Sequence, residues 1–167
     1  MGWKVCYRCT RDPGAMKVAI TGASGFIGRH LLPLLIKNGH DVIAVVRDKN
    51  KIVNLDDNCH VVEYEITDEN NDVYSMLGKP DILLHLAWGG LPNYNSLHHI
   101  DVELSLHYRF IKSLVESGLR HVSVIGTCFE YGMQSGELSE DLDTFPSNPY
   151  GYAKDALRKQ LQFLQSK

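Results

Sequence analysis

The chain has 167 residues and a formal charge of −3, with 44% hydrophobic and 22% charged residues. This balance excludes the strong positive field that attracts nucleic acid or anionic lipid, so we expect neither partner. No apolar stretch approaches the ~20 residues of a membrane span, and the four cysteines form no disulfide framework. Together these features predict one soluble, cytoplasmic domain.

The first fifteen residues show neither helical nor strand periodicity, and Met16 precedes the first apolar strand as a natural start would. We expect residues 1–15 to be an unstructured leader and residues 16–167 to form the domain. Cys6-x-x-Cys9 could supply half of a zinc site, but no second ligand pair follows at a usable spacing. We therefore assign the leader no chemistry and the chain no metal.

From Lys17 onward, short β-branched runs alternate with longer amphipathic segments, which is typical of βαβ units in a parallel sheet. The strands are expected at residues 17–21, 41–46, 60–64, 81–86 and 121–126. The helices are expected at about residues 25–37, with a kink at Pro33, and at about 94–117 and 149–166. Right-handed crossovers then predict an α/β fold: a doubly wound parallel sheet of order 3-2-1-4-5 in three αβα layers.

Three glycines, Gly22, Gly25 and Gly28, lie where the first strand passes into the first helix. In a Rossmann fold such glycines form the tight turn, let the backbone approach a pyrophosphate, and let helix and strand pack closely. A glycine triplet alone is a weak signal, but here it stands between a strand and a helix, whose N-terminus can bind an anion. We expect a dinucleotide to contact Gly22, Ser24, Gly25, Phe26, Ile27 and Gly28.

The end of the second strand bears on the choice of dinucleotide. This strand ends in Arg47, which could pair with the 2′-phosphate of NADP, whereas an NAD site generally has a carboxylate there. The sequence therefore favours NADP(H) over NAD(H). In the alternative interpretation, Arg47 is a solvated loop charge and Asp48 binds the ribose.

Tyr150 and Lys154 are four residues apart in the last predicted helix and so share a face. We expect the lysine ammonium to lower the pKa of the tyrosine, which would make Tyr150 a general acid or base near neutral pH. Thr127, at the carboxyl end of the fifth strand, could share a substrate oxygen with it. The alternative is a pair of surface residues, because Tyr-x-x-x-Lys often occurs by chance.

Four motifs stand in a fixed order: Thr21-Gly-x-x-Gly-x-x-Gly28, His85-Leu86-Ala87, Thr127 before Tyr131-Gly132, and Asn148-Pro149-Tyr150-x-x-x-Lys154. Together they resemble the extended short-chain dehydrogenase/reductases, the NAD(P)-dependent epimerase/dehydratase family of nucleotide-sugar enzymes. The resemblance implies that Tyr150 is the catalytic acid/base, that Lys154 binds the cofactor ribose and that Thr127 orients the substrate. It also implies cofactor contacts from Glu65, Ile66, Leu86, Ala87 and Trp88.

The same resemblance bears on assembly and completeness. Relatives continue for well over a hundred further residues, so we expect an N-terminal Rossmann portion without the usual C-terminal strands and substrate domain. The chain would then be catalytically incomplete. The two long helices build a homodimer interface in relatives, which implies a dimer here, although core packing alone would explain much of their apolar stripes.

Several residues depart from the family pattern or admit two interpretations. Where 4,6-dehydratases carry an acidic residue after the threonine, this chain has Cys128 and Phe129, and Glu130 on an extended segment would point away. Cys128 is expected to be a small buried hydrophobe rather than a reactive thiol. His98, His99 and His107 are assigned to a helix face without a carboxylate partner. Two smaller departures are Asp101, in place of an asparagine, and Glu65, in place of an aspartate.

The favoured hypothesis is an NAD(P)-dependent nucleotide-sugar epimerase or ketoreductase that moves a hydride with Tyr150 as acid/base. The alternative is a dinucleotide-binding module without turnover. A nucleotide-sugar 4,6-dehydratase is the least favoured of the three.

Overall fold

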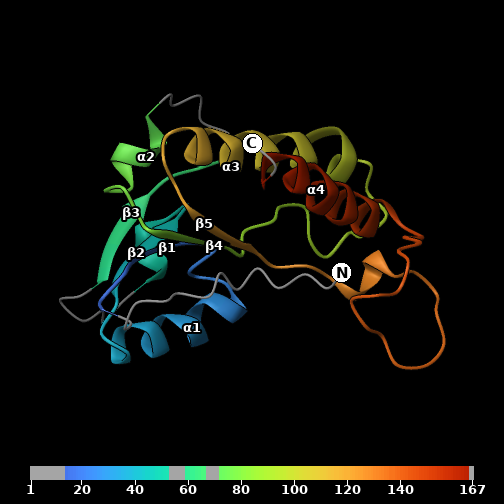
Figure 1. Ribbon diagram of the computed structural model, residues 1–167, viewed down its shortest axis with the longest axis horizontal. Helices are drawn as coiled ribbons and strands as arrows, with labels where there is room; N and C mark the ends of the chain where they lie inside the picture. Colours follow the sequence, from blue (N-terminus) through green and yellow to red (C-terminus); the bar gives the residue numbers. More distant parts are fainter. Residues whose placement is uncertain (1–13, 53–58, 67–71, 166–167) are drawn as a thin grey trace. The chain divides into compact units, whose positions relative to one another are not determined.

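A computed structural model of the chain describes residues 14–52, 59–66 and 72–165. Five parallel strands form one sheet of order β3-β2-β1-β4-β5, as Figure 1 shows. Their bounds are β1 (Lys17–Thr21), β2 (Asp41–Val46), β3 (Cys59–Glu63), β4 (Ile82–His85) and β5 (His121–Val124). The predicted α/β class and strand order are confirmed, with strand ends within two residues of those expected. The leader, with Cys6 and Cys9, lies outside the described residues except for its last two positions.

The chain divides into two compact units. The sheet unit contains all five strands and consists of the described residues up to 87 together with 113–125. The helical unit consists of residues 88–112 and the described residues from 126 onward. Helix α3 (Leu104–Glu116) contributes residues to both units.

The core of the sheet unit follows from the apolar sequences of its central strands. Val18 and Ile20 of β1 form one cluster with Val42, Ala44 and Val46 of β2 and with Ala23 and Leu32, and helix α1 (Phe26–Lys37) supplies Leu35 and Ile36 around it. Alternate strand residues point to the opposite face, and Ala19, Ile43 and Val45 are also buried there. Both faces of the central strands are therefore covered, as in doubly wound folds.

Helix α1 runs from Phe26 to Lys37 without a break at Pro33, which lies inside it. It ends as predicted at Asn38 and at Gly39, whose φ of +80° is the left-handed conformation that glycine adopts readily. The helix α2 (Val73–Met76) was not predicted, and its N-cap Asp72 accepts a hydrogen bond from the backbone of Ser75.

The single helix predicted over residues 94–117 is wrong in its first part. The segment before His99 forms turns, residues His99–Glu103 form the π-helix η2, and only then does α3 begin. At this interruption two side chains bond to the preceding loop. His99 contacts the carbonyl of Asn93, and Glu103 accepts a hydrogen bond from the backbone of Gly89. Wide turns of this kind often occur at functional sites.

The last helix, α4 (Pro149–Gln165), is confirmed, and the short 3-10 helices η1 (Lys49–Lys51) and η3 (Cys128–Glu130) lie in loops. No helix within the described ranges is both long enough and apolar enough to cross a membrane.

Candidate active site

Two glycines of the predicted phosphate turn are required by the fold. Gly22 has a φ of +69°, and a Cβ atom at this position would lie 2.8 Å from the backbone nitrogen of Ala87. A Cβ at Gly28 would lie 2.5 Å from the carbonyl oxygens of both Gly22 and Ala23. A side chain at either position would therefore push apart the turn, the start of α1 and the segment after β4.

Gly25 has a different place in the turn. It is the N-cap of α1 with an extended backbone (φ −75°, ψ 177°), and no side chain caps the helix. The first turn carries no acidic residue, and the side chains of Phe26 and Ile27 are 81% and 46% exposed. The N–H groups at the start of α1 are thus not satisfied by a capping side chain, which fits the pyrophosphate of a dinucleotide.

The carboxyl ends of β1 and β4 are joined by side-chain contacts. The buried Thr21 hydroxyl lies 2.9 Å from Nδ1 of His85 and accepts a hydrogen bond from the backbone of Ala87 at 3.4 Å. Leu86, which lies between His85 and Ala87 in the sequence, is partly buried and packs against the sheet core. This contact places Ala87 beside Gly22, so two predicted cofactor-binding segments meet within the sheet unit.

The residues after β2 and β3 lie at the same edge of the sheet, because parallel strands end together. Arg47 is exposed directly after β2. Asp48 caps η1 by accepting a hydrogen bond from the backbone of Asn50 at 3.0 Å. Glu65 is exposed and Ile66 is half-buried, two and three residues beyond the end of β3.

In the helical unit, Tyr150 stands in the first turn of α4. The side chain of Asn148 caps this helix by accepting from the backbone of Gly151 at 2.8 Å, and Pro149 occupies the first helical position. The backbone of Tyr150 donates to the carbonyl of Tyr94 at 3.1 Å. Its ring is surrounded, at centroid distances of 5.3 to 6.2 Å, by the rings of Trp88, Tyr94, His99 and Phe129.

This enclosure raises the pKa of Tyr150, because burial disfavours the phenolate. A hydrogen bond with the side chain of Thr127 acts in the opposite direction but is the smaller effect. The prediction that Lys154 lowers this pKa is therefore wrong, since burial dominates. That Thr127 shares a substrate oxygen with Tyr150 stays a prediction.

Lys154 lies one turn after Tyr150 and is only 3% exposed. Its Nζ atom lies 4.5 Å from the ring centroid of Trp88 and has no hydrogen-bond partner among the described residues. Burial lowers its pKa to about 8, against the opposing charge of Glu130. A buried ammonium with unused donors fits a ligand that brings hydroxyl oxygens, such as the ribose of a dinucleotide.

Glu130 does not lie on an extended segment, so that expectation is wrong. Residues 128–130 form η3, where the buried Glu130 accepts from the backbone of Thr127 at 2.8 Å and pairs with Arg158 at 3.3 Å. Cys128 is exposed, which corrects the expectation of a buried hydrophobe. The turn of η3 directs Glu130 inward and leaves Cys128 outside.

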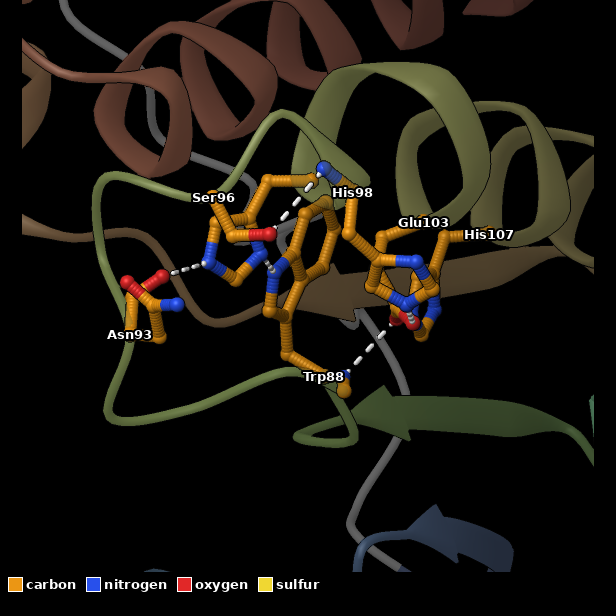
Figure 2. A network of polar contacts seen from close by, with 8 residues as sticks. Trp88, Asn93, Ser96, His98, Glu103 and His107 are labelled. Atoms are coloured by element: carbon orange, nitrogen blue, oxygen red, sulfur yellow. Dashed lines mark hydrogen bonds and ion pairs between the residues drawn. The ribbon is translucent and has the colours of Figure 1, made fainter.

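Glu103 is a buried residue that belongs to none of the sequence motifs described above. Figure 2 shows its carboxylate with three donors: the backbone of Gly89 at 2.8 Å and Nε2 of His98 and of His107, each at 2.9 Å. The assignment of these histidines to a helix face without a carboxylate partner is thus wrong. The i, i+4 spacing of Glu103 and His107 was a usable signal.

The electrostatics of this group follow from its hydrogen bonds. The bond from His107 is the largest effect that lowers the pKa of Glu103, to about 2. Burial lowers the pKa of His107, so it donates as a neutral ring near pH 7. Within the described ranges, no three His, Cys, Asp or Glu side chains are placed to hold a metal ion.

The parallel sheet, its strand order and the glycine turn after β1 define a Rossmann-type fold, the class in which dinucleotide-binding proteins are found. The family model of the NAD dependent epimerase/dehydratase family matches residues 18–166, and the chain belongs to this family. The predicted family membership is thereby confirmed. Its curated relatives include nucleotide-sugar dehydrogenases and epimerases, so the chain is a member of an enzyme family.

One curated relative is the dTDP-6-deoxy-L-talose 4-dehydrogenase (NAD(+)) of Aggregatibacter actinomycetemcomitans. It is 32% identical over 147 residues, which are 87% of this chain and 54% of the relative. The chain spans about half the length of the curated relatives it matches.

Solved structures of other proteins share the fold of this chain. MoeE5 in complex with UDP-glucuronic acid and NAD is 26% identical with a TM-score of 0.73, over 90% of this chain and 50% of that protein. The Bordetella bronchiseptica enzyme WbmG in complex with NAD has a TM-score of 0.76 at 19% identity, over 92% and 51% of the two chains, and shows the likeness of fold. The names of these relatives give NAD as their cofactor, so the preference for NADP gains no support.

Proposed function

We propose that this chain forms the cofactor-binding and catalytic portion of a nucleotide-sugar epimerase or ketoreductase, with Tyr150 as its acid/base. The observation that carries the proposal is the ammonium of Lys154, which is buried without a hydrogen-bond partner among the described residues, one turn from Tyr150. Burying an ammonium without an acceptor is costly, so such a group is expected where a ligand completes it. Tyr150 and Lys154 are both buried, which does not fit the alternative interpretation of a pair of surface residues.

The residues around Tyr150 have separate tasks in the proposed reaction. Bound NAD supplies a hydride acceptor or donor at the sugar carbon. Tyr150 removes the proton from the hydroxyl of that carbon during oxidation and returns one during reduction. Thr127 bonds to the tyrosine and shares the substrate oxygen. Lys154 binds the ribose hydroxyls with the donors of its buried ammonium.

For the cofactor we propose NAD, bound along the turn from Gly22 to Gly28 and beside Ala87. The names of the relatives support NAD over NADP. Arg47 is exposed after β2 and would act as a solvated charge in this proposal. Replacing Arg47 with alanine is then expected to change NAD affinity by less than about threefold, whereas a phosphate-pairing arginine would contribute at least tenfold to NADP affinity. Calorimetric titration with both dinucleotides distinguishes these outcomes.

The proposal ranks a dehydratase activity below the epimerase and ketoreductase activities. Elimination of water requires a second acid/base beside the leaving hydroxyl. Glu130, the nearest acidic residue in sequence to Thr127, is bonded to the backbone of Thr127 and to Arg158. It therefore has a structural task.

Two further proposals concern partners. The substrate class is nucleotide sugars, as the names of the relatives indicate. A homodimer is proposed from the family resemblance, and Tyr152 and Phe163 of α4, which are 52% and 73% exposed, offer apolar surface for it. The second candidate function is dinucleotide binding without turnover, which the test below distinguishes from the first.

The test replaces Tyr150 with phenylalanine and uses Tyr152→Phe as the matched control, because Tyr152 is exposed on the same helix turn. With dTDP- and UDP-activated sugars, ketoreductase turnover is followed by NADH absorbance and epimerase turnover by chromatographic separation of the sugar epimers. Tyr150→Phe is expected to lower kcat by about 10²–10⁴-fold, with NADH affinity retained and the control unaffected. Equal turnover in wild type and Tyr150→Phe would refute the role of Tyr150. NADH binding without turnover on any sugar would favour the binding module.

A further inference from the structure

Trp88 is held in place on several sides within the helical unit. Its indole Nε1 donates to Nδ1 of His99 at 3.1 Å, and its ring stacks on His107 at a centroid distance of 4.5 Å and an interplanar angle of 10°. The dashed bonds of Figure 2 show the polar part of this arrangement. The hydrogen bond at one edge of the indole and the stacked ring on its face together restrict its orientation.

The backbone next to Trp88 is fixed by Glu103. Its Oε2 accepts from the backbone of Gly89 at 2.8 Å and from His107 at 2.9 Å. A Cβ atom at Gly89 would overlap this carboxylate, so only glycine permits the contact. One side chain thus anchors both the backbone beside the indole and the histidine stacked on it.

His99 also holds Trp88 in place, and one tautomer of the neutral His99 ring fits both of its hydrogen bonds. Because Trp88 donates to Nδ1, the proton of a neutral His99 lies on Nε2, which donates to the carbonyl of Asn93 at 2.9 Å. His99 is fully buried. A charged ring would carry a proton on Nδ1 and break the bond to Trp88.

The indole lies beside the ammonium of Lys154, at 4.5 Å. We propose that Glu103 and His99 are positioning residues of the proposed site: they hold the indole of Trp88 against the Lys154 ammonium and so keep water from it. The inference rests on the proposed function only in assigning Lys154 to the cofactor. The arrangement exists without a bound ligand.

The physical advantage is a cation whose donors are kept for the ligand. The face of an indole attracts an ammonium but accepts no full hydrogen bond from it, so this attraction offsets only part of the cost of excluding water, and the N–H groups stay unused. Titratable groups of two other elements face this ammonium. Glu130 of η3 favours the cation, and His107 of α3 is kept neutral by burial. The pKa of about 8 at Lys154 agrees with an ammonium sheltered from water.

The experiment measures the pH midpoint for acetylation of Lys154 by acetic anhydride in the full chain without cofactor, read by peptide mass spectrometry. The exposed Lys37 is the internal control. Trp88→Leu and Glu103→Leu are expected to move the midpoint upward from about 8 toward 10.5, the ordinary value for lysine. Trp88→Phe, which keeps a ring but loses the bond to His99, is expected to give an intermediate midpoint.

Glu103→Gln separates position from charge. Its amide oxygen can accept from Gly89 and His107, and the half-exposed His98 can adopt the tautomer that accepts the amide proton. The midpoint is therefore expected to stay at the wild-type value. An unchanged midpoint in Trp88→Phe would overturn the proposal, as would an upward shift of the midpoint in Glu103→Gln. Should any leucine variant not fold, Trp88→Phe and Glu103→Gln still decide. Failure of the wild type to bind NAD would refute the proposed function and leave these midpoints unaffected.

Discussion

Burial has the largest effect on the pKa of both residues of the proposed catalytic pair. The pKa of Lys154 falls to about 8 although Glu130 opposes the change, and the pKa of Tyr150 rises although Thr127 bonds to it. The spacing of the pair was readable from the sequence, because residues four apart share a helix face. The direction of the tyrosine pKa was not, because it depends on rings such as Tyr94 and Phe129 that lie far away in the chain.

The pKa of Lys154 predicts how cofactor binding depends on pH. Only the protonated amine offers three donors, so the affinity for NADH is expected to be constant below pH 7 and to weaken as the pH rises beyond about 8. Fluorescence titration across this range measures it. Lys154→Met should bind more weakly at pH 7 and lose the dependence, whereas Lys159→Met should retain it. A pH-independent wild type would contradict the assigned role.

Glu103 predicts an acid-sensitive part of the stability. Its pKa is about 2 in the folded chain against an ordinary 4.5, so its carboxylate stabilises the fold above pH 4.5, and this contribution disappears as the pH falls through about 2. The difference corresponds to about 3 kcal/mol in the free energy of unfolding.

Urea unfolding of wild type and Glu103→Gln at a series of pH values measures this contribution. Wild type is expected to be more stable at pH 7 and to approach the variant near pH 2. The exposed Glu63→Gln serves as control and is expected to change little. A stability difference that does not vary with pH would show that the charge of Glu103 is not responsible.

At the scale of elements, the turn between β1 and α1 divides its tasks among its glycines. Gly28 meets two carbonyl oxygens at 2.5 Å from where its Cβ would lie, whereas Gly25 has an ordinary backbone conformation and its nearest such neighbour is at 3.1 Å. The sequence predicted both tasks, because the triplet lies between a strand and a helix. It could not predict π-helix η2, which coincides with the bonds of Glu103 and His99 to a loop.

Alanine at each of these glycines is expected to separate folding from binding. Gly28→Ala should lose about 1–3 kcal/mol or more of stability through overpacking. Gly25→Ala should fold but lose NADH binding, because its methyl group would occupy the space of the pyrophosphate. Thermal unfolding and NADH titration on both variants make the comparison. A folded Gly25→Ala with wild-type affinity would show that the dinucleotide does not approach this turn.

At the scale of the whole molecule, strand order and class were predictable because right-handed crossovers leave few arrangements for alternating strands and helices. The carboxyl ends of β1 and β4 meet at Thr21, His85 and Ala87, as the motif order implied. The surroundings of Lys154 were not predictable, since Trp88 and its supports precede the helix by a long stretch of chain. Periodicity describes single elements and carries no information on such distant contacts.

The central proposal is that this member of the epimerase/dehydratase family binds a nicotinamide dinucleotide, with separate contacts proposed for the glycine turn and for Lys154. Calorimetric titration of the chain with NAD and NADP tests it most directly. We predict saturable binding of one NAD per chain, tighter than that of NADP and weakened in both Gly25→Ala and Lys154→Met. Absence of heat with either dinucleotide, from a chain shown to be folded, would contradict the account.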